Sequence, residues 1–212
     1  MAKLYVSNKD ESARLFKSDL LEPFSHVHWS VPIILYVPVV AFFLYRASQT
    51  PEITTMSGTL IFLSGVFVWT LTEYLLHRFV FHYEPSSTWG KQLHFLMHGV
   101  HHDYPQDHTR LVMPPPVSIP LAAAFGLLFS ALFGAHWEAI FAGFLVGYVI
   151  YDTTHYATHH WKMQGGLGRF LREYHLRHHF RDDDLGYGVS SPLWDYVFGT
   201  VSTRTRTDRQ AA

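Results

Sequence analysis

Histidine is the residue whose number and spacing in this sequence could support chemistry. The chain has 212 residues and 16 histidines, as many as Lys and Arg together. Twelve of them lie in four short segments, "HRFVFH" at 77–82, "HFLMHGVHH" at 94–102, "HYATHH" at 155–160 and "HLRHH" at 175–179. Neutral imidazole is a good donor to iron, zinc and copper. So many clustered rings predict a site for two such metal ions.

The spacing within the segments selects which rings would converge. Residues three or four apart share one face of an α-helix. The last three histidines of the second and fourth segments are therefore each expected to point in one direction. His77 and His82 are five apart and would diverge more, which suggests that one lies at a frayed helix end. Leaving out His94 and His160, which fit less regularly, gives ten candidate metal ligands: His77, His82, His98, His101, His102, His155, His159, His175, His178 and His179.

The alternative is that these histidines are packed core residues without a metal. Burial without a metal would leave ring nitrogens without hydrogen-bond partners, and each would cost about 1–3 kcal/mol of stability. We therefore favour metal binding for the four segments. His26 and His28, before the first apolar run, are expected in the membrane interface, and His136 is expected to be structural. For His108, a position behind the ligands and a role in the loop scaffold remain equally open.

Two carboxylates are candidates for orienting the ligands. Glu73 lies four residues before His77, and Asp152 lies three residues before His155. Metal-bound histidines usually donate their other ring N–H to a carboxylate or a carbonyl. We therefore expect Glu73 and Asp152 behind the metal ligands.

Composition excludes several other kinds of protein. Cysteine is absent, which rules out disulfides, thiolate-ligated haem and cysteine-held iron–sulfur clusters. The formal net charge of −1 gives no basis for binding nucleic acid. Charged residues make up 16% of the chain, against about 25% in soluble domains. No apolar region of signal-peptide type opens the sequence.

Four apolar runs must position the histidines. They span about residues 29–45, 53–76, 117–134 and 137–154, and each approaches the length of a membrane-spanning helix. Lys and Arg are concentrated before the first run, between the second and third, and after the fourth. This distribution predicts four crossings with both termini and every histidine segment on the cytoplasmic side. We expect one all-α membrane domain over 1–212, a four-helix transmembrane bundle with a cytoplasmic helical cap. Residues 1–28 would be a polar N-terminal segment and 202–212 a disordered tail.

The sequence resembles the fatty acid hydroxylase superfamily and, more narrowly, the fatty acid 2-hydroxylases that act on sphingolipids. The resemblance covers roughly residues 60 to 200 and rests on "EYLLHRFVFH", "HGVHHDYPQDHTRLVMPP", "GYVIYDTTHYATHH", "YHLRHHF" and "SSPLWDYVFGT". The histidine segments alone would also fit membrane desaturases and sterol or carotenoid oxygenases. The longer phrases favour the 2-hydroxylases. Carrying over the family's ligands gives the same ten histidines.

The resemblance implies a function. Two metal ions, iron in the active enzyme and zinc possible in a purified form, would use O2 to hydroxylate carbon 2 of a lipid acyl chain. The sequence has no room for the haem domain that some members carry, so electrons would come from a separate cytochrome b5 with its reductase or from a ferredoxin. The protein would lie in the endoplasmic reticulum membrane in a eukaryote, or in the inner membrane in a bacterium. A membrane metal carrier is a remote alternative, because transporters place their ligands at mid-membrane.

Further residues in the family phrases are candidates for contacts behind the ligands or with the lipid headgroup. For the aromatic ones, interfacial packing is an equal alternative. Together with Glu73 and Asp152, these candidates are His94, Tyr104, His108, His160, Tyr187, Trp194 and Asp195.

Overall fold

The computed structural model describes residues 4–203, and within that range the chain is helical or irregular, without strands. The predicted all-α class is therefore confirmed. The α-helices are α1 (Val31–Ser48), α2 (Thr55–Leu76), α3 (Thr88–His94), α4 (Val100–Asp103), α5 (Pro115–Phe133), α6 (Trp137–His160), α7 (Gly166–Phe180) and α8 (Leu193–Phe198). Two π-helices, η2 (His77–Phe81) and η3 (Phe95–Gly99), and two 3-10 helices, η1 (Glu22–Ser25) and η4 (Gly134–His136), complete the order.

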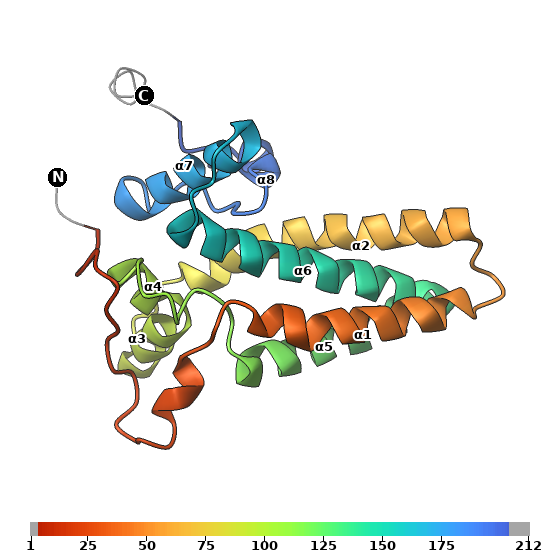
Figure 1. The fold of residues 1–212 in the computed structure, drawn as a ribbon, viewed down its shortest axis with the longest axis horizontal. Helices are drawn as coiled ribbons and strands as arrows, with labels where there is room; N and C mark the ends of the chain where they lie inside the picture. Colours follow the sequence, from red (N-terminus) through yellow and green to blue (C-terminus); the bar gives the residue numbers. More distant parts are fainter. Residues whose placement is uncertain (1–3, 204–212) are drawn as a thin grey trace.

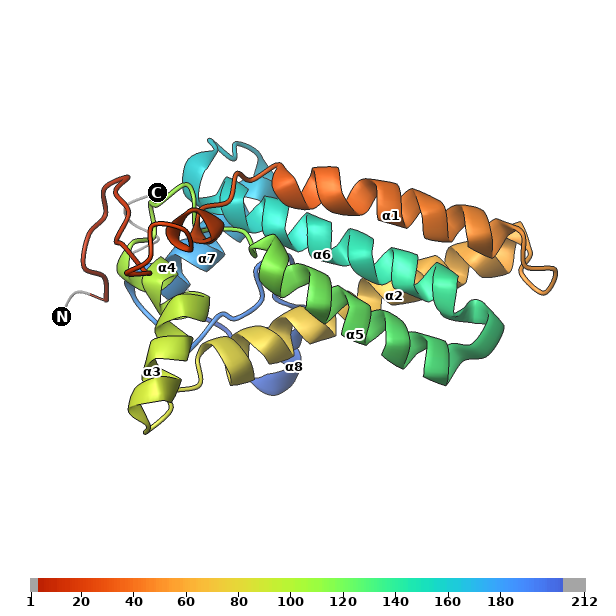
Figure 2. The same cartoon turned by 90° about the horizontal axis from the view of Figure 1, so that it is seen from below.

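The four longest helices, α1, α2, α5 and α6, lie along one another in a bundle (Figures 1 and 2). Three segments are long and apolar enough to cross a membrane: Val31–Ser48, Thr55–Phe81 and Pro115–His160. The last holds both α5 and α6, because the chain turns back at Gly134, whose φ of 51° suits a residue without a side chain. The chain is thus a multi-pass membrane protein. The prolines of "MPPP" fit the start of α5, where a missing N–H breaks no helical hydrogen bond.

Helix α6 is the centre of the bundle. It contacts α1, α2 and α5, and most of its side chains are buried. Helices α2 and α6 approach so closely that a Cβ atom added to Gly143 would lie 1.9 Å from the Phe62 carbonyl oxygen. A Cβ on Gly65 would lie 2.0 Å from the Ile140 carbonyl oxygen. At the far end, Arg46 of α1 forms a 2.8 Å ion pair with the buried Glu138 of α6.

Helices α3, α4, α7 and α8 gather at one end of the bundle, opposite the α1–α2 and α5–α6 connections (Figures 1 and 2). The N-terminal segment crosses this end, where Val6 N–H donates to the Asp103 carbonyl and Val27 N–H to the Thr109 carbonyl. Ser202, the first residue of the predicted tail, is buried and donates to Asp182. Residues 204–212 of that tail lie outside the described part of the chain.

Candidate metal centre

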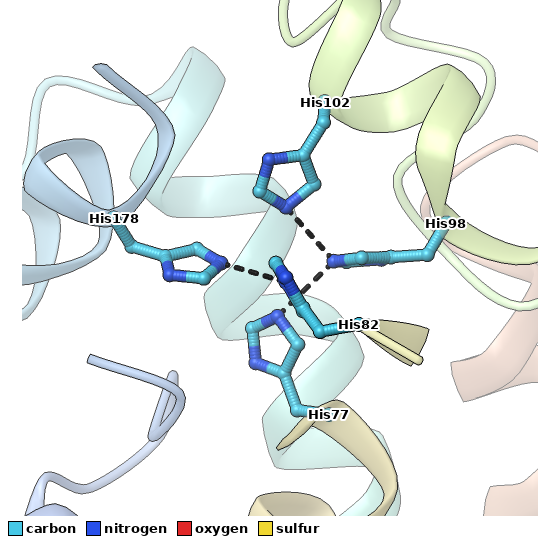
Figure 3. A group of neighbouring side chains, drawn as sticks. All are labelled: His77, His82, His98, His102 and His178. Atoms are coloured by element: carbon cyan, nitrogen blue, oxygen red, sulfur yellow. Dashed lines mark hydrogen bonds between the residues drawn. The ribbon is translucent and has the colours of Figure 1, made fainter. Parts of the chain in front are cut away.

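The ten histidines selected by spacing come together at this end of the bundle as two groups of five. In each group the ring nitrogens that face one another lie within 4.8 Å. Figure 3 shows the five rings of group A pointing toward a common centre from three parts of the chain. Group A comprises His77, His82, His98, His102 and His178, and group B comprises His101, His155, His159, His175 and His179.

Each histidine triplet is divided between the groups, which corrects the expectation that its three rings point one way. In η3–α4, His98 and His102 belong to group A, whereas His101 belongs to group B. In α7, His175 and His179 belong to group B, whereas His178 belongs to group A. Residues four apart are about 40° apart around a helix, and the third histidine is displaced to the side. Each triplet therefore lies between two sites and contributes to both.

A π-helix corrects the expectation that His77 and His82 diverge. In η2 the His82 N–H donates to the His77 carbonyl oxygen at 3.1 Å, an i→i+5 bond. The wider turn returns the sixth residue to the face of the first, and the two ring centroids are 5.0 Å apart. The second π-helix, η3, runs through His98. Single π-turns are often found at functional sites.

Backbone carbonyls, rather than the expected carboxylates, orient three of the rings. His77 Nδ1–H donates to the Tyr187 carbonyl oxygen at 2.5 Å, and His178 Nδ1–H donates to the Leu185 carbonyl oxygen at 2.8 Å. The backbone of Leu111 is the partner of His155. A carbonyl only accepts, so the proton lies on Nδ1 in His77 and His178, and their Nε2 lone pairs face the group.

Burial keeps the rings of both groups uncharged. It lowers the pKa of His82 to about 3 and the pKa of His178 to about 4. It is also the main reason why the pKa values of His98 and His175 lie well below the usual range. The Nε2 atoms of His82 and His178 are 3.1 Å apart. Neutral nitrogens gathered this closely, with lone pairs turned inward, fit a bound metal cation.

The two groups are in contact. The rings of His102 and His179 stack with 4.3 Å between centroids, and the rings of His98 and His101 lie 5.6 Å apart. The Nδ1 atoms of four group B rings have no partner within residues 4–203; these rings are His101, His159, His175 and His179. Group A is therefore held more firmly by the backbone than group B.

The loop that supplies these carbonyls is itself held by two buried carboxylates. Asp195 accepts from the N–H groups of Tyr187 and Gly188 at 2.9 and 2.8 Å. Glu73 accepts from those of Val189 and Ser190 at 2.7 and 2.8 Å, and from the Ser190 hydroxyl. Glu73 thus supports His77 through the loop rather than by the direct bond that its position in the sequence suggested. Asp152 likewise accepts from the Met113 N–H at 3.4 Å.

Among the other candidates, Tyr187 packs directly on group A. Its ring lies 5.3 Å from the ring of His82 and 5.7 Å from that of His178. Trp194 lies against the bundle instead, where its indole N–H donates to Thr70 at 2.9 Å. This contact agrees with the packing alternative for Trp194.

The remaining histidine and tyrosine candidates lie outside both groups. His108 is half exposed and pairs with Asp10 at 2.7 Å, which agrees with a role in the loop scaffold. His160 stacks on Tyr156 with 4.9 Å between ring centroids. His94 and Tyr104 are half-buried, at the ends of α3 and α4.

An apolar cavity of about 560 Å³ reaches both histidine groups. His98 of group A and His101 and His155 of group B form one part of its wall. Another part consists of Leu15, Phe16, Leu21 and Phe24 of the N-terminal segment. Sequence reasoning missed this wall and Arg110, which also lines the cavity. The sequence indicated these residues only weakly. The wall consists of a few apolar residues in a polar segment, and Arg110 is one basic residue in a histidine-rich loop.

Comparison with known proteins identifies the family. The model of the family described as fatty acid hydroxylase matches residues 62–200. The chain belongs to the fatty acid hydroxylase family. It is therefore an enzyme of the hydroxylase class, as the sequence resemblance predicted.

Relatives of this hydroxylase cover most of the chain. A dihydroceramide fatty acyl 2-hydroxylase of Arabidopsis thaliana is 43% identical, over 91% of this chain and 81% of that protein. The ceramide very long chain fatty acid hydroxylase of Saccharomyces cerevisiae is 44% identical over 89% of this chain, which spans about half (49%) of that protein. The fatty acid 2-hydroxylase of Rattus norvegicus is 41% identical, over 89% of this chain and 56% of that protein.

A solved structure of full-length Scs7p, in which the hydroxylase domain is visible, has the same fold. It superposes with a TM-score of 0.85 at 43% identity, covering 91% of this hydroxylase and 73% of that chain.

Proposed function

We propose that this enzyme uses two iron ions and O2 to hydroxylate carbon 2 of a lipid acyl chain. The observation that carries the proposal is the apolar cavity that ends on histidines of both groups. A long acyl chain fits such a cavity by burial of its methylene groups, which stabilises binding by about 0.8 kcal/mol each. Several relatives are named as 2-hydroxylases of fatty acyl chains, which favours this reaction over a desaturase or a sterol or carotenoid oxygenase.

The ten histidines are the proposed ligands, five to each metal ion. Bound iron would supply the redox chemistry with O2 that no side chain of the protein can supply. The protein provides neutral nitrogen donors, which keep the site cationic. The carbonyls of Leu185 and Tyr187 hold two group A rings in the tautomer that leaves Nε2 free to bind metal.

Regioselectivity comes from positioning. A saturated acyl chain offers many C–H bonds of similar strength, so the site of reaction depends on which carbon the cavity holds against the histidines. Buried side chains such as Leu111 and Val112 exclude water from that point. The backbone N–H groups of residues 187–190 are occupied by Glu73 and Asp195, so the loop behind group A is fixed before substrate binds.

The setting of the reaction follows the topology expected from the charges. The distribution of Lys and Arg supports four crossings, by α1, α2, α5 and α6, with the histidine end on the cytoplasmic side. Electrons come from a separate cytochrome b5 with its reductase or from a ferredoxin. The membrane is that of the endoplasmic reticulum in a eukaryote or the inner membrane in a bacterium.

The test is lipid mass spectrometry with the purified, iron-loaded protein. With O2, a reduced electron donor and a lipid bearing a deuterated acyl chain, we expect a product hydroxylated at carbon 2 with one deuterium lost from that carbon. Formation of a double bond, or hydroxylation elsewhere along the chain, would refute the proposed reaction.

A further inference from the structure

A buried tyrosine lies near group A and has no part in the proposed function. Tyr74, in the last turn of α2, has an exposed fraction of 0%. Its ring lies edge-on to the ring of Tyr187, with 6.1 Å between centroids. The Tyr187 ring in turn lies 5.3 Å from that of His82 and 5.7 Å from those of His77 and His178. The two phenol rings therefore form an aromatic path from group A to the end of α2.

The hydroxyl group of Tyr74 has a defined donor direction. Arg78 Nη1 donates to the Tyr74 oxygen at 2.8 Å, and the Thr200 hydroxyl donates to Asp195 Oδ1 at 2.8 Å. The hydroxyl oxygens of Tyr74 and Thr200 are 3.0 Å apart. A hydroxyl group has one proton to donate, and Thr200 donates its proton to the carboxylate. The Tyr74 O–H must therefore donate to Thr200, and two hydrogen bonds in series lead from the phenol to Asp195.

The charges around Tyr74 favour loss of an electron together with a proton. A phenol that lost only an electron would carry a positive charge, which the Arg78 guanidinium bonded to its oxygen would oppose. Thr200 offers the proton a route, because it can take the proton of Tyr74 while it passes its own to Asp195. Burial raises the pKa of the Asp195 carboxyl, which makes Asp195 a better proton acceptor.

The proposed reaction creates a need for such a group. Its oxidant must be strong enough to remove hydrogen from an alkyl chain. When the cavity holds no acyl chain, the oxidant faces the histidine rings and the Tyr187 ring instead. A phenol loses an electron more readily than an imidazole or an alkyl side chain. A tyrosine that can also release its proton is therefore a suitable donor.

We propose that Tyr74 is a redox-active residue that discharges an oxidising equivalent from group A when no acyl chain is bound. One electron passes from Tyr74 through the Tyr187 ring to the oxidised centre. The Tyr74 O–H bond breaks, its proton goes to Thr200 Oγ1, and the Thr200 proton goes to Asp195. A neutral tyrosyl radical and a protonated carboxyl remain. The electron donor of the proposed function then returns one electron, and both protons move back.

This inference rests on the proposed function, which supplies the oxidant and the electron donor. It adds a protective redox site, because each electron from Tyr74 spares a group A ring from oxidation. Tyr187 and Thr200 act through Tyr74, the first as the electron path and the second as the proton path.

The first test needs neither iron nor turnover. The chain has no cysteine, so Asp184→Cys gives a single attachment point for a ruthenium photo-oxidant, at an exposed position three residues before Tyr187. Zinc, which has no redox chemistry, fills the histidine groups. A light flash should produce a tyrosyl radical, followed by transient absorption, that forms more slowly in D2O. Tyr74→Phe should shorten the radical lifetime at least about tenfold, and Thr200→Val should abolish the effect of D2O.

The matched control for the flash experiment is Tyr36→Phe. Tyr36 is a buried tyrosine of α1, and its ring packs on Tyr148 rather than on a histidine ring. This variant should give the wild-type radical. A radical of unchanged lifetime in Tyr74→Phe would overturn the inference.

The second test observes Tyr74 in the iron-loaded enzyme. With O2, a reduced electron donor and no lipid, electron paramagnetic resonance should detect a tyrosyl radical, and saturating lipid should suppress it. Tyr74→Phe should lack this signal. It should also be inactivated at least about tenfold faster than the wild type when lipid is absent, and at the wild-type rate when lipid is present. Tyr36→Phe should behave as the wild type under both conditions.

The two tests separate the inference from the proposed function. If the flash places a radical on Tyr74 but the iron-loaded wild type neither hydroxylates lipid nor forms a radical with O2, the redox site stands and the proposed function fails. If lipid is hydroxylated but Tyr74→Phe is inactivated at the wild-type rate without lipid, the proposed function stands and the inference is overturned.

Discussion

Glu73 and Asp195 divide four consecutive backbone N–H groups between them, those of residues 187–190. Glu73 belongs to α2 and Asp195 to α8, so the two carboxylates are 195 − 73 = 122 positions apart in the sequence. Between them they fix the loop whose Tyr187 carbonyl accepts from His77. The position of a proposed metal ligand thus depends on two acidic residues that do not touch its ring.

This relationship gives a prediction for Asp195→Asn. Both Asp195 oxygens accept from backbone N–H groups, so an amide would place its own NH2 donor against one of them. We expect a loss of about 1–3 kcal/mol in the free energy of unfolding, and a 10–100-fold weaker metal affinity or lower activity, as for other residues behind metal ligands. Metal titration and thermal unfolding would measure both. Asp183→Asn, at an exposed position, is the matched control. An Asp195→Asn protein with wild-type metal affinity would contradict the role given to the loop.

The division of the ten histidines predicts a specific pattern of metal loss. His98→Ala removes a ligand from group A, and His175→Ala removes one from group B. Each variant should lose metal first from its own group, so elemental analysis should approach one metal ion per chain, and hydroxylation should fall at least 10–100-fold. The exposed His136 lies outside both groups. His136→Ala should therefore keep two metal ions per chain. Two tightly held metal ions in both ligand variants would show that the groups are not the sites.

The close contact between α2 and α6 predicts that Gly143→Ala is destabilising. The added Cβ would lie 1.9 Å from the Phe62 carbonyl oxygen, a rigid backbone atom. The helices would have to separate, at a cost of about 1–3 kcal/mol or more. Gly166→Ala, where no atom lies within 4 Å of the new Cβ, provides the comparison. Thermal unfolding in detergent should show a lower midpoint for Gly143→Ala alone, and equal midpoints would mean that the helices do not pack as described.

The buried imidazoles predict how the stability of the metal-free protein depends on pH. In the unfolded chain His82 and His178 titrate near 6.5, whereas in the fold their pKa values are about 3 and about 4. Below pH 6.5 the unfolded state therefore binds more protons than the native state. The free energy of unfolding is therefore highest above pH 6.5. It decreases as the pH falls from 6.5 toward 4.

Thermal midpoints of the metal-free protein measured between pH 8 and pH 4.5 would check this dependence. Gln does not titrate, so His178→Gln should flatten the profile below pH 6.5 by up to about 1.4 kcal/mol per pH unit. A midpoint that is constant down to pH 4.5, or one that rises, would contradict the buried neutral state of these rings.

The distribution of Lys and Arg predicts the topology. Tags at both termini and a label in the segment 85–110 should all report from the cytoplasm, because the basic residues flank these regions. A label in the connection between α1 and α2, near residue 51, should report from the other side. Accessibility labelling that places residues 85–110 opposite the C-terminus would refute the four-crossing arrangement.

Local features of the sequence determined the helical class and the ten candidate ligands. Apolar runs and their proline and glycine boundaries are encoded within each helix. The histidines that recur three and four residues apart in the four histidine segments can be recognised without any knowledge of the fold. Spacing alone also left His94 and His160 out of the ligand set, and both lie outside the two groups of five.

Tertiary structure decided how the rings are shared and what holds them. The spacing in "HLRHH" is compatible with one site or two, and only the opposing helices place His178 in one group and His175 and His179 in the other. The η2 π-turn that brings His82 back beside His77 depends on a hydrogen bond that the sequence pattern does not reveal. Glu73 was expected at His77 because four residues separate them, yet the loop before α8 directs the N–H groups of residues 189 and 190 to Glu73 instead. Contacts between distant segments depend on which backbone groups remain unpaired after packing, and no local spacing specifies that.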